Sequence, residues 1–235
     1  MNAASIKKVL ILVTILAVPG FLYYLLQDKG KNRYRPLAIF GPKAVASTFH
    51  SVRGKNIPDT IYHVVDDFKL INQAGDSVSW KNYDRKVVIV SLFYTTGNTH
   101  AVTFANKAMR AFDATFDHNK SVNFISLSID PVKDNPAVIS AFAKTLPAKA
   151  GKWDMLTGDS THIYNLINKG LFIDAHQDLT GGEKKFIYSN MFVLLDMKHR
   201  IRGYYEATSQ EALSKLDDEI KVLMAEELRN TNDGR

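Results

Sequence analysis

The sequence predicts an α/β protein, and three observations carry that prediction. The run at residues 87–92 is apolar except for one serine, as buried parallel strands are, and residues 122–129 are expected to form a second buried strand. A helix-periodic segment follows each run. Near the C-terminus, two further strand-like runs precede one amphipathic segment. A parallel βαβ unit followed by an antiparallel ββα unit accounts for this order.

The first half of the domain begins with a short hairpin over residues 68–80, whose turn contains Ala74, Gly75 and Asp76. The strand at 87–92 comes next. A helix over 99–117 follows, because apolar residues recur there at steps of three and four. These residues are Ala101, Phe104, Ala105, Ala108, Phe112 and Phe116.

The second half begins with the strand at 122–129. Asn135 and Pro136 suit the cap and first turn of a helix that ends near Thr145. A short strand at 153–156 precedes a helix from Asp159 to Gly170. Two strands, 186–196 and 200–205, form a hairpin around 197–199. Thr208 and Glu211 then form a capping box for the last helix, whose apolar face contains Leu213, Leu216, Ile220 and Leu223.

This order of elements is the pattern of a thioredoxin-like fold, a central mixed sheet flanked by helices, with an N-terminal β-hairpin extension. One transmembrane helix is expected before the domain. The predicted organisation is a flank at 1–8, an anchor at 9–26, a linker and approach segment at 27–59, the domain at 60–228 and a polar tail at 229–235. The stretch FYTTGNTHAV, residues 93–102, then lies at the strand-to-helix turn where such folds keep their chemistry.

The N-terminal segment predicts a membrane anchor. Residues 9–26 contain no charge, and eighteen helical residues reach about 27 Å, enough to cross a bilayer. A cleaved signal peptide is the alternative, but no small-x-small cleavage site follows the apolar run, which favours a retained anchor. Basic residues flank the run on both sides, so charge alone leaves its orientation open.

Charge and cysteine content exclude several functions. The net charge is +6, but the first 35 residues contain six basic residues and one acid, so residues 36–235 carry only about +1. A nucleic-acid-binding domain needs a basic surface that this balance does not supply. The chain has no cysteine, which excludes disulfides, thiolate catalysis and thiolate metal sites.

Several stretches resemble the SCO/SenC family of membrane-anchored, thioredoxin-fold copper chaperones that serve assembly of the CuA site of cytochrome c oxidase. The runs SIDPVKDNP (128–136), WDMLTG (153–158) and SNMFVLLDMKHRIRGYY (189–205) are similar to family segments. FYTTGNTHAV is similar to the family loop F-x-[FY]-T-x-C-P-x-x-C-P. The resemblance covers about residues 60–228.

The resemblance implies a copper site of two cysteines and one histidine, and this chain has none of the three. The cysteine positions fall on Gly97 and Ala101, the histidine position falls on Tyr188, and the loop prolines fall on Asn98 and Val102. Glycine and alanine have no donor atom, and a tyrosine binds metal only as a phenolate, which its pKa near 10 disfavours. The sequence therefore predicts a vacated site with no metal and no cofactor.

Three residues remain as weak substitutes for the missing metal ligands. His100 lies in the loop, where it is either a replacement ligand or an ordinary polar residue at a helix start. His176 lies in a polar insertion before the strand of Tyr188. Asp130 follows a core strand, where a functional carboxylate is favourably placed, whereas Asp134 is better explained as a loop or cap residue.

The leading hypothesis is a protein that acts by binding rather than as an enzyme. It is expected to be an accessory factor in cytochrome oxidase assembly, anchored in the inner membrane, with its domain facing the periplasm. Its partners are the membrane and a protein in oxidase assembly, with no nucleic acid and no small-molecule substrate. The alternatives are a rewired metal or acid/base site using His100, His176 and Asp130, and a structural subunit of a membrane complex.

Overall fold

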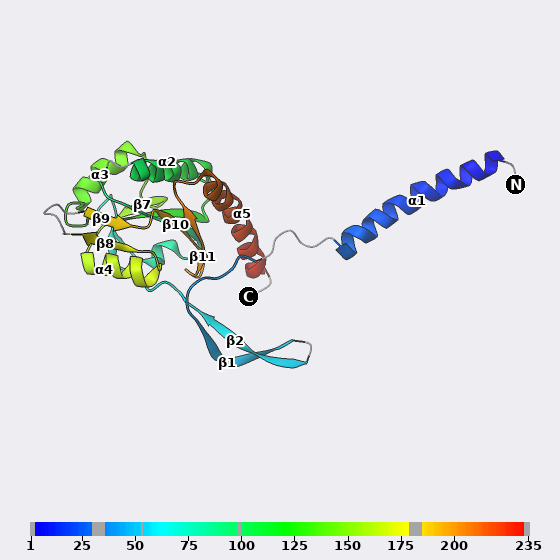
Figure 1. The fold of residues 1–235 in the computed structure, drawn as a ribbon, viewed down its shortest axis with the longest axis horizontal. Coiled ribbons are helices and arrows are strands. Elements are labelled where there is room, and N and C mark those ends of the chain that lie inside the picture. The colour runs from blue at the N-terminus through cyan, green and yellow to red at the C-terminus, as the bar shows by residue number, and fades with distance from the viewer. Residues whose placement is uncertain (1–2, 30–35, 53, 98–99, 179–184, 233–235) are drawn as a thin grey trace. The chain divides into compact units, whose positions relative to one another are not determined.

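The computed structural model describes residues 3–29, 36–52, 54–97, 100–178 and 185–232 (Figure 1). The chain divides into two units, Met1–Arg35 and Pro36–Arg235. The first unit contains one helix, α1 (Ala3–Lys29), which includes Pro19 and whose described apolar side chains are exposed except for the half-buried Leu25. Among the residues that the structure describes, no helix is both long enough and apolar enough to cross a membrane.

A five-stranded mixed sheet forms the centre of the second unit, in the order β11-β10-β5-β6-β7 (Figure 1). Strands β5 (Val87–Phe93), β6 (Val122–Ser128) and β7 (Trp153–Leu156) are parallel. Strand β10 (Met191–Leu195) runs antiparallel to β5 and to β11 (Ile201–Glu206). Every residue of β5 and β6 is buried, which is why β5 is apolar except for Ser91, whereas β6 also buries Asn123, Ser126 and Ser128. The predicted α/β, thioredoxin-like layout is confirmed.

Helices cover both faces of this sheet. Alternate residues of β5 reach opposite cores: Val87 and Ile89 pack in one, Val88 and Val90 in the other. The first core is completed by α2 (His100–Thr115), α3 (Pro136–Thr145) and α5 (Gln210–Asn232). The second core contains residues of the short helix η1 (Trp80–Tyr83), of α4 (Ser160–Asn165) and of the π-helical turn η2 (Leu166–Gly170).

The predicted helix starts at Asn135 and Asp159 are confirmed by their hydrogen bonds. The Asn135 side chain accepts the backbone N–H groups of residues 137 and 138, and Asp159 accepts that of His162. The predicted hairpin at 68–80 is also present, as β3 (Leu70–Ile71) and β4 (Ser77–Val78). Gly75 has a φ of +88° in its turn, a conformation that favours glycine.

A second hairpin lies in the segment predicted as linker and approach. Strands β1 (Lys43–Val52) and β2 (Lys55–Tyr62) pair only with each other in the described sheets, with Gly54 at φ +77° in the turn. Nearly all of their residues are exposed, so no buried face imposes an alternation that sequence reading detects. Pro58 lies within β2, and a proline argues against a strand when the sequence is read alone.

Two boundaries near the C-terminus were predicted wrongly. The expected strand at 186–196 is two strands, because β9 (Lys185–Tyr188) pairs with β8 (Ala175–Asp178), and β10 begins at Met191. The last helix is capped by Ser209, whose Oγ accepts the Ala212 N–H at 3.3 Å. The Thr208 hydroxyl instead donates to Glu206, so the predicted capping box is not formed. Helix α5 continues to Asn232, into the segment predicted as a polar tail, and residues 233–235 lie outside the described part.

Candidate functional site

The turn between β5 and α2 lies at the carboxyl end of the sheet, where the sequence placed the site. It contains Tyr94, Thr95, Thr96 and Gly97, and the Gly97 N–H donates to the Tyr94 carbonyl at 3.1 Å. Asn98, one of the two predicted proline positions, lies outside the described residues together with residue 99. Val102, the other, is buried in the first turn of α2.

A buried carboxylate shapes this turn from the neighbouring strand-to-helix connection. Asp134 is fully buried and accepts the Thr95 N–H, with 3.2 Å between the Thr95 nitrogen and Asp134 Oδ2. The Thr95 hydroxyl also donates to Asp134, and the Ser128 hydroxyl donates to Oδ2 at 2.6 Å. Asp134 therefore holds two loops together, rather than capping α3, a role that Asn135 fills.

The position of the first cysteine, Gly97, has little room for a side chain. A Cβ added there would lie 2.9 Å from Cζ and 3.0 Å from Cε1 of Tyr94, and 3.1 Å from Cγ1 of Val102. These distances are shorter than ordinary van der Waals contacts, so any side chain at position 97 must displace the Tyr94 ring. The Tyr94 ring thus packs against the backbone where a ligand side chain would begin.

The Tyr94 ring also contacts the strand that contains the predicted histidine position. Its centroid lies 5.0 Å from that of Phe186 and 6.2 Å from that of Tyr188, which meets it edge-to-face. Burial raises the pKa of Tyr188 to about 12, with a smaller contribution from Tyr94. Tyr188 is therefore a neutral phenol at physiological pH, a poor metal ligand.

The three weak substitutes, His100, His176 and Asp130, do not come together at one point. His100 is exposed at the first position of α2, and its ring stacks on Phe104 of its own helix at 5.9 Å. His176 pairs with Ile187, and both are exposed, on the opposite face of the β8–β9 ribbon from Tyr188. Its Nδ1 lies 3.5 Å from Asp174 Oδ1.

Asp130, the third substitute, is fully buried, and its backbone carbonyl accepts the N–H groups of Lys133 and Asp134. Within the described residues, no three His, Cys, Asp or Glu side chains lie close enough together to hold a metal ion. Copper therefore does not fit the described residues at this position, because Gly97 has no donor atom and Tyr188 keeps its proton.

Two residues that shape the site were missed by sequence reasoning. Tyr94 was read only as part of the loop motif, and Asp134 only as a loop or cap residue. Both residues belong to motifs that are visible in the sequence. Their contacts are not visible there, because they join distant segments: Thr95 and Asp134, for example, are 39 positions apart. Only the packed fold reveals such contacts.

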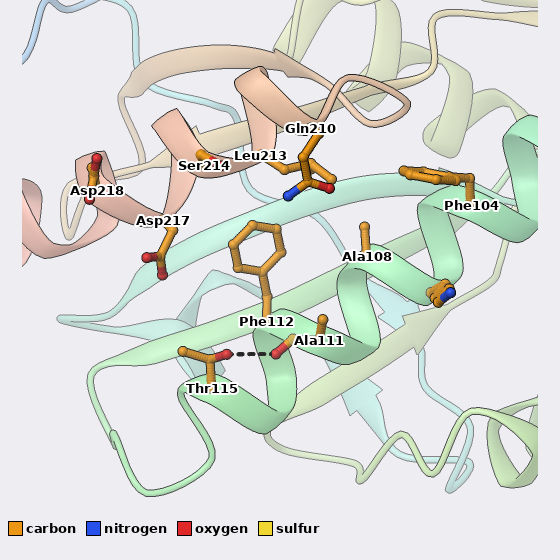
Figure 2. A pocket seen from close by; sticks show the side chains of 11 residues that line it. Phe104, Ala108, Ala111, Phe112, Thr115, Gln210, Leu213, Ser214, Asp217 and Asp218 are labelled. Carbon is orange, nitrogen blue, oxygen red and sulfur yellow. Dashed lines mark hydrogen bonds between the residues drawn. The ribbon is translucent and has the colours of Figure 1, made fainter.

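A separate groove of about 610 Å³ lies between α2 and α5 (Figure 2). Phe104, Ala108 and Phe112 line it from α2, and Gln210 and Leu213 line it from α5. Asp217 and Asp218 stand at one end of the groove, where Asp217 already pairs with Lys221 at 2.5 Å. None of the predicted site residues lines this groove, so it is not part of the candidate site.

Comparison with known proteins identifies the family. The family model described as SCO1/SenC matches residues 58–224. A SCO1 protein homolog of Bacillus subtilis is 25% identical over 175 residues, which is 72% of this chain and 86% of that protein. A SCO2-like protein of Rickettsia typhi is 22% identical over 220 residues, 92% of this chain and 99% of that protein.

Solved structures show the same fold. A SCO1/SenC family lipoprotein from Bacillus anthracis superimposes with a TM-score of 0.60 at 22% identity, covering 69% of this chain and 95% of that one. Arabidopsis thaliana ScoI with copper bound gives 0.56 at 18% identity, covering 69% and 99%. Since the family model spans well over half of the sequence, the chain belongs to the SCO1/SenC family.

Proposed function

We propose that this member of the SCO1/SenC family is a membrane-anchored accessory factor in cytochrome c oxidase assembly that acts by binding and neither carries copper nor catalyses a reaction. One structural relative, BsSco, is described as a member of the Sco family of cytochrome c oxidase assembly proteins. Other relatives have been solved with copper bound. The assembly role rests on this kinship, and the loss of copper rests on the residues of this chain.

The observation that carries the proposal is the packing at Gly97. Two thiolates suit Cu(I), and an imidazole completes a site that also holds Cu(II). Here the first thiolate position is a glycine whose missing Cβ leaves space that the end of the Tyr94 ring occupies. Tyr94 in turn packs against Tyr188, at the position of the imidazole. The Tyr94 ring therefore contacts two of the three positions at which a copper ligand of the family is replaced.

What the turn retains is its shape. The hydrogen bonds of Asp134 to Thr95 and Ser128 join the two loops at the carboxyl end of the sheet without any metal. The surface beside them includes Val132, which is 74% exposed. A shaped, partly apolar surface without metal chemistry suits recognition of a protein partner.

The anchor and location are part of the same proposal. Residues 9–26 form an uncharged apolar run, and most of the described large apolar side chains of α1 are exposed. We place this segment in the inner membrane as a single span, with the domain on the periplasmic side. The support is the length of the run and the family resemblance.

The direct test is titration of the purified full chain with Cu(I) and Cu(II) against competing chelators. The expected result is no tight one-to-one binding by the wild type. Tight stoichiometric binding that is lost in His100→Ala or His176→Ala would overturn the proposal. The assembly role is tested by recovering membrane proteins with the tagged full chain, and it fails if no oxidase subunit is recovered.

A structural subunit of a membrane complex is the second candidate, and one observation favours it. The β1–β2 hairpin exposes several large apolar side chains, and such surfaces on monomeric domains mark contact sites. The same recovery experiment separates the two candidates. Equal amounts of chain and oxidase subunits in the mature complex would indicate a subunit, whereas recovery restricted to immature complexes would indicate an assembly factor. No observation favours the rewired site.

A further inference from the structure

The β1–β2 hairpin exposes apolar side chains without a described covering element. Val45 is 76% exposed and Phe49 is 63% exposed, although large apolar residues at such exposure are usually covered by a partner. The base of the hairpin is held to the domain. The His63 N–H donates to the Pro42 carbonyl at 3.1 Å, and His63 Nε2 lies 2.8 Å from the Gly170 carbonyl oxygen.

The two faces of the hairpin differ in charge. Phe49 is paired with Pro58, Val45 with Thr60 and Lys43 with Tyr62, so these six residues share one face, here called the Phe49 face. It contains no acidic residue, and Lys43 Nζ lies 5.5 Å from the centre of the Tyr62 ring.

The opposite face contains the exposed Ile57 and Ile61 together with Lys55 and with Asp59, whose Oδ1 lies 2.6 Å from His50 Nδ1. Hydrogen bonds from Thr48 and His50 lower the pKa of Asp59, so this carboxylate is charged at neutral pH. A charged carboxylate opposes contact with an anionic surface, so the Phe49 face is the one suited to such contact.

The hairpin also concentrates positive charge. Residues 43–62 contain Lys43, Arg53 and Lys55 against the single acid Asp59, a net charge of +2. Residues 36–235 carry +1 in total, so the remainder of this unit carries −1. The excess of basic residues thus lies on the element that follows the N-terminal segment in the chain.

We infer that the Phe49 face of the hairpin lies on the surface of an anionic phospholipid bilayer. This inference rests on the membrane anchoring in the proposed function. Lys43 follows the end of α1 by fourteen positions, which limits the connecting chain to about 50 Å. Phe49 and Val45 enter the boundary between headgroups and acyl chains, and Lys43 meets lipid phosphates.

A lipid surface fits these features better than a protein partner does. Exposed aromatic and apolar side chains beside a lysine, with no acid on the same face, are what an anionic interface attracts. Such a contact is weak alone and becomes effective beside an anchor, because stable membrane attachment takes two signals. The hairpin then fixes how the domain is presented above the bilayer.

The test uses residues 36–235, which contain both hydrophobic cores and form a compact unit without α1. Binding to vesicles of phosphatidylglycerol and of phosphatidylcholine is measured by co-sedimentation. We expect binding to the phosphatidylglycerol vesicles only, weakened about tenfold by Phe49→Ser and about fivefold by Lys43→Gln. The matched control is Ile61→Ser, at 57% exposure on the opposite face, which should change binding by less than about twofold.

Several outcomes overturn the inference. These are no binding to either vesicle, equal loss in Phe49→Ser and Ile61→Ser, or loss of oxidase recovery in full-length Phe49→Ser without any vesicle binding by the domain. The last result would assign the hairpin to a protein partner. If the domain does not bind vesicles but the full chain still inserts into membranes and recovers oxidase subunits, the proposed function is intact. Failure of the lipid inference is therefore distinguishable from failure of the proposed function.

The full chain offers a second test because it has no cysteine. A single cysteine introduced by Val45→Cys is labelled with an environment-sensitive fluorophore, in protein reconstituted into phosphatidylglycerol vesicles. Val132→Cys is the matched control, since Val132 is 74% exposed but lies outside the hairpin. We expect a blue-shifted signal from position 45 and a water-like signal from position 132. Water-like signals from both positions would overturn the inference.

Discussion

Two strand-to-helix turns meet at the same edge of the sheet, and they differ in what they retain. The turn after β6 keeps the family run SIDPVKDNP, with Asp130 and Asp134 fully buried and Asn135 capping α3. The turn after β5 has none of the family's thiol ligands. It is nevertheless held in place, because Asp134 accepts the backbone and hydroxyl hydrogen atoms of Thr95. The comparison teaches that hydrogen bonds between the two turns, which need no metal, hold the first turn in place.

The largest expected effect comes from removing the connection between these turns. Asp134→Ala leaves the Thr95 N–H and the hydroxyls of Thr95 and Ser128 without their acceptor. We expect it to lower the free energy of unfolding by about 4 kcal/mol, measured by urea denaturation. The control is Asp159→Ala, which removes an exposed helix cap and should cost about 1 kcal/mol. Equal losses in the two variants would show that the turns are not coupled through Asp134.

The second prediction restores the missing donors to the retained shape. The triple variant Gly97→Cys, Ala101→Cys and Tyr188→His should bind Cu(I) at least about a hundredfold more tightly than the wild type. Replacing Tyr188 also removes one of the rings against which Tyr94 packs. Affinity is measured by competition with a chromogenic chelator.

A matched control keeps the size of the new side chains without the thiolates. It is the variant Gly97→Ser, Ala101→Ser and Tyr188→His, which should bind no better than the wild type. If the cysteine variant also fails while remaining folded, the first turn has lost its shape as well as its donors.

A smaller effect tests the contact at Gly97. Gly97→Ala places a Cβ against the end of the Tyr94 ring, so its cost should depend on that ring. In a double-mutant cycle with Tyr94→Ala we expect a coupling free energy of about 1 kcal/mol, measured by chemical denaturation. The cycle cancels the effect of alanine on the unfolded chain. A coupling near zero would mean that the ring moves aside without cost.

The smallest effect concerns the pH dependence of stability. Burial raises the pKa of Tyr188 to about 12 in the folded protein, against about 10 in the unfolded chain. The unfolded state therefore loses this proton first, so the stabilisation is present below pH 10 and is lost as pH rises toward 12. Comparing the melting temperatures of wild type and Tyr188→Phe from pH 9 to 11.5 should show a steeper decline for the wild type. Parallel curves would contradict the assigned burial.

Most of the fold was predictable because its signals are local. The run of β5 is apolar except for one serine, since both faces of this strand are buried. The caps at Asn135 and Asp159 are satisfied within three residues of the cap. The β1–β2 hairpin gave no such signal, because its exposed faces impose no alternation, and the division of 186–196 depends on pairing with the distant β8.

The candidate site divides in the same way. The sequence by itself determined which donors are absent, since the chemistry of glycine, alanine and tyrosine follows from residue identity at positions 97, 101 and 188. Only the tertiary structure decided that the Tyr94 ring fills the space at Gly97, that His176 faces away from Tyr188, and that Asp134 holds Thr95. The reason is physical: donor atoms belong to single residues, whereas packing, facing and hydrogen bonding between loops depend on distances that only the folded chain defines.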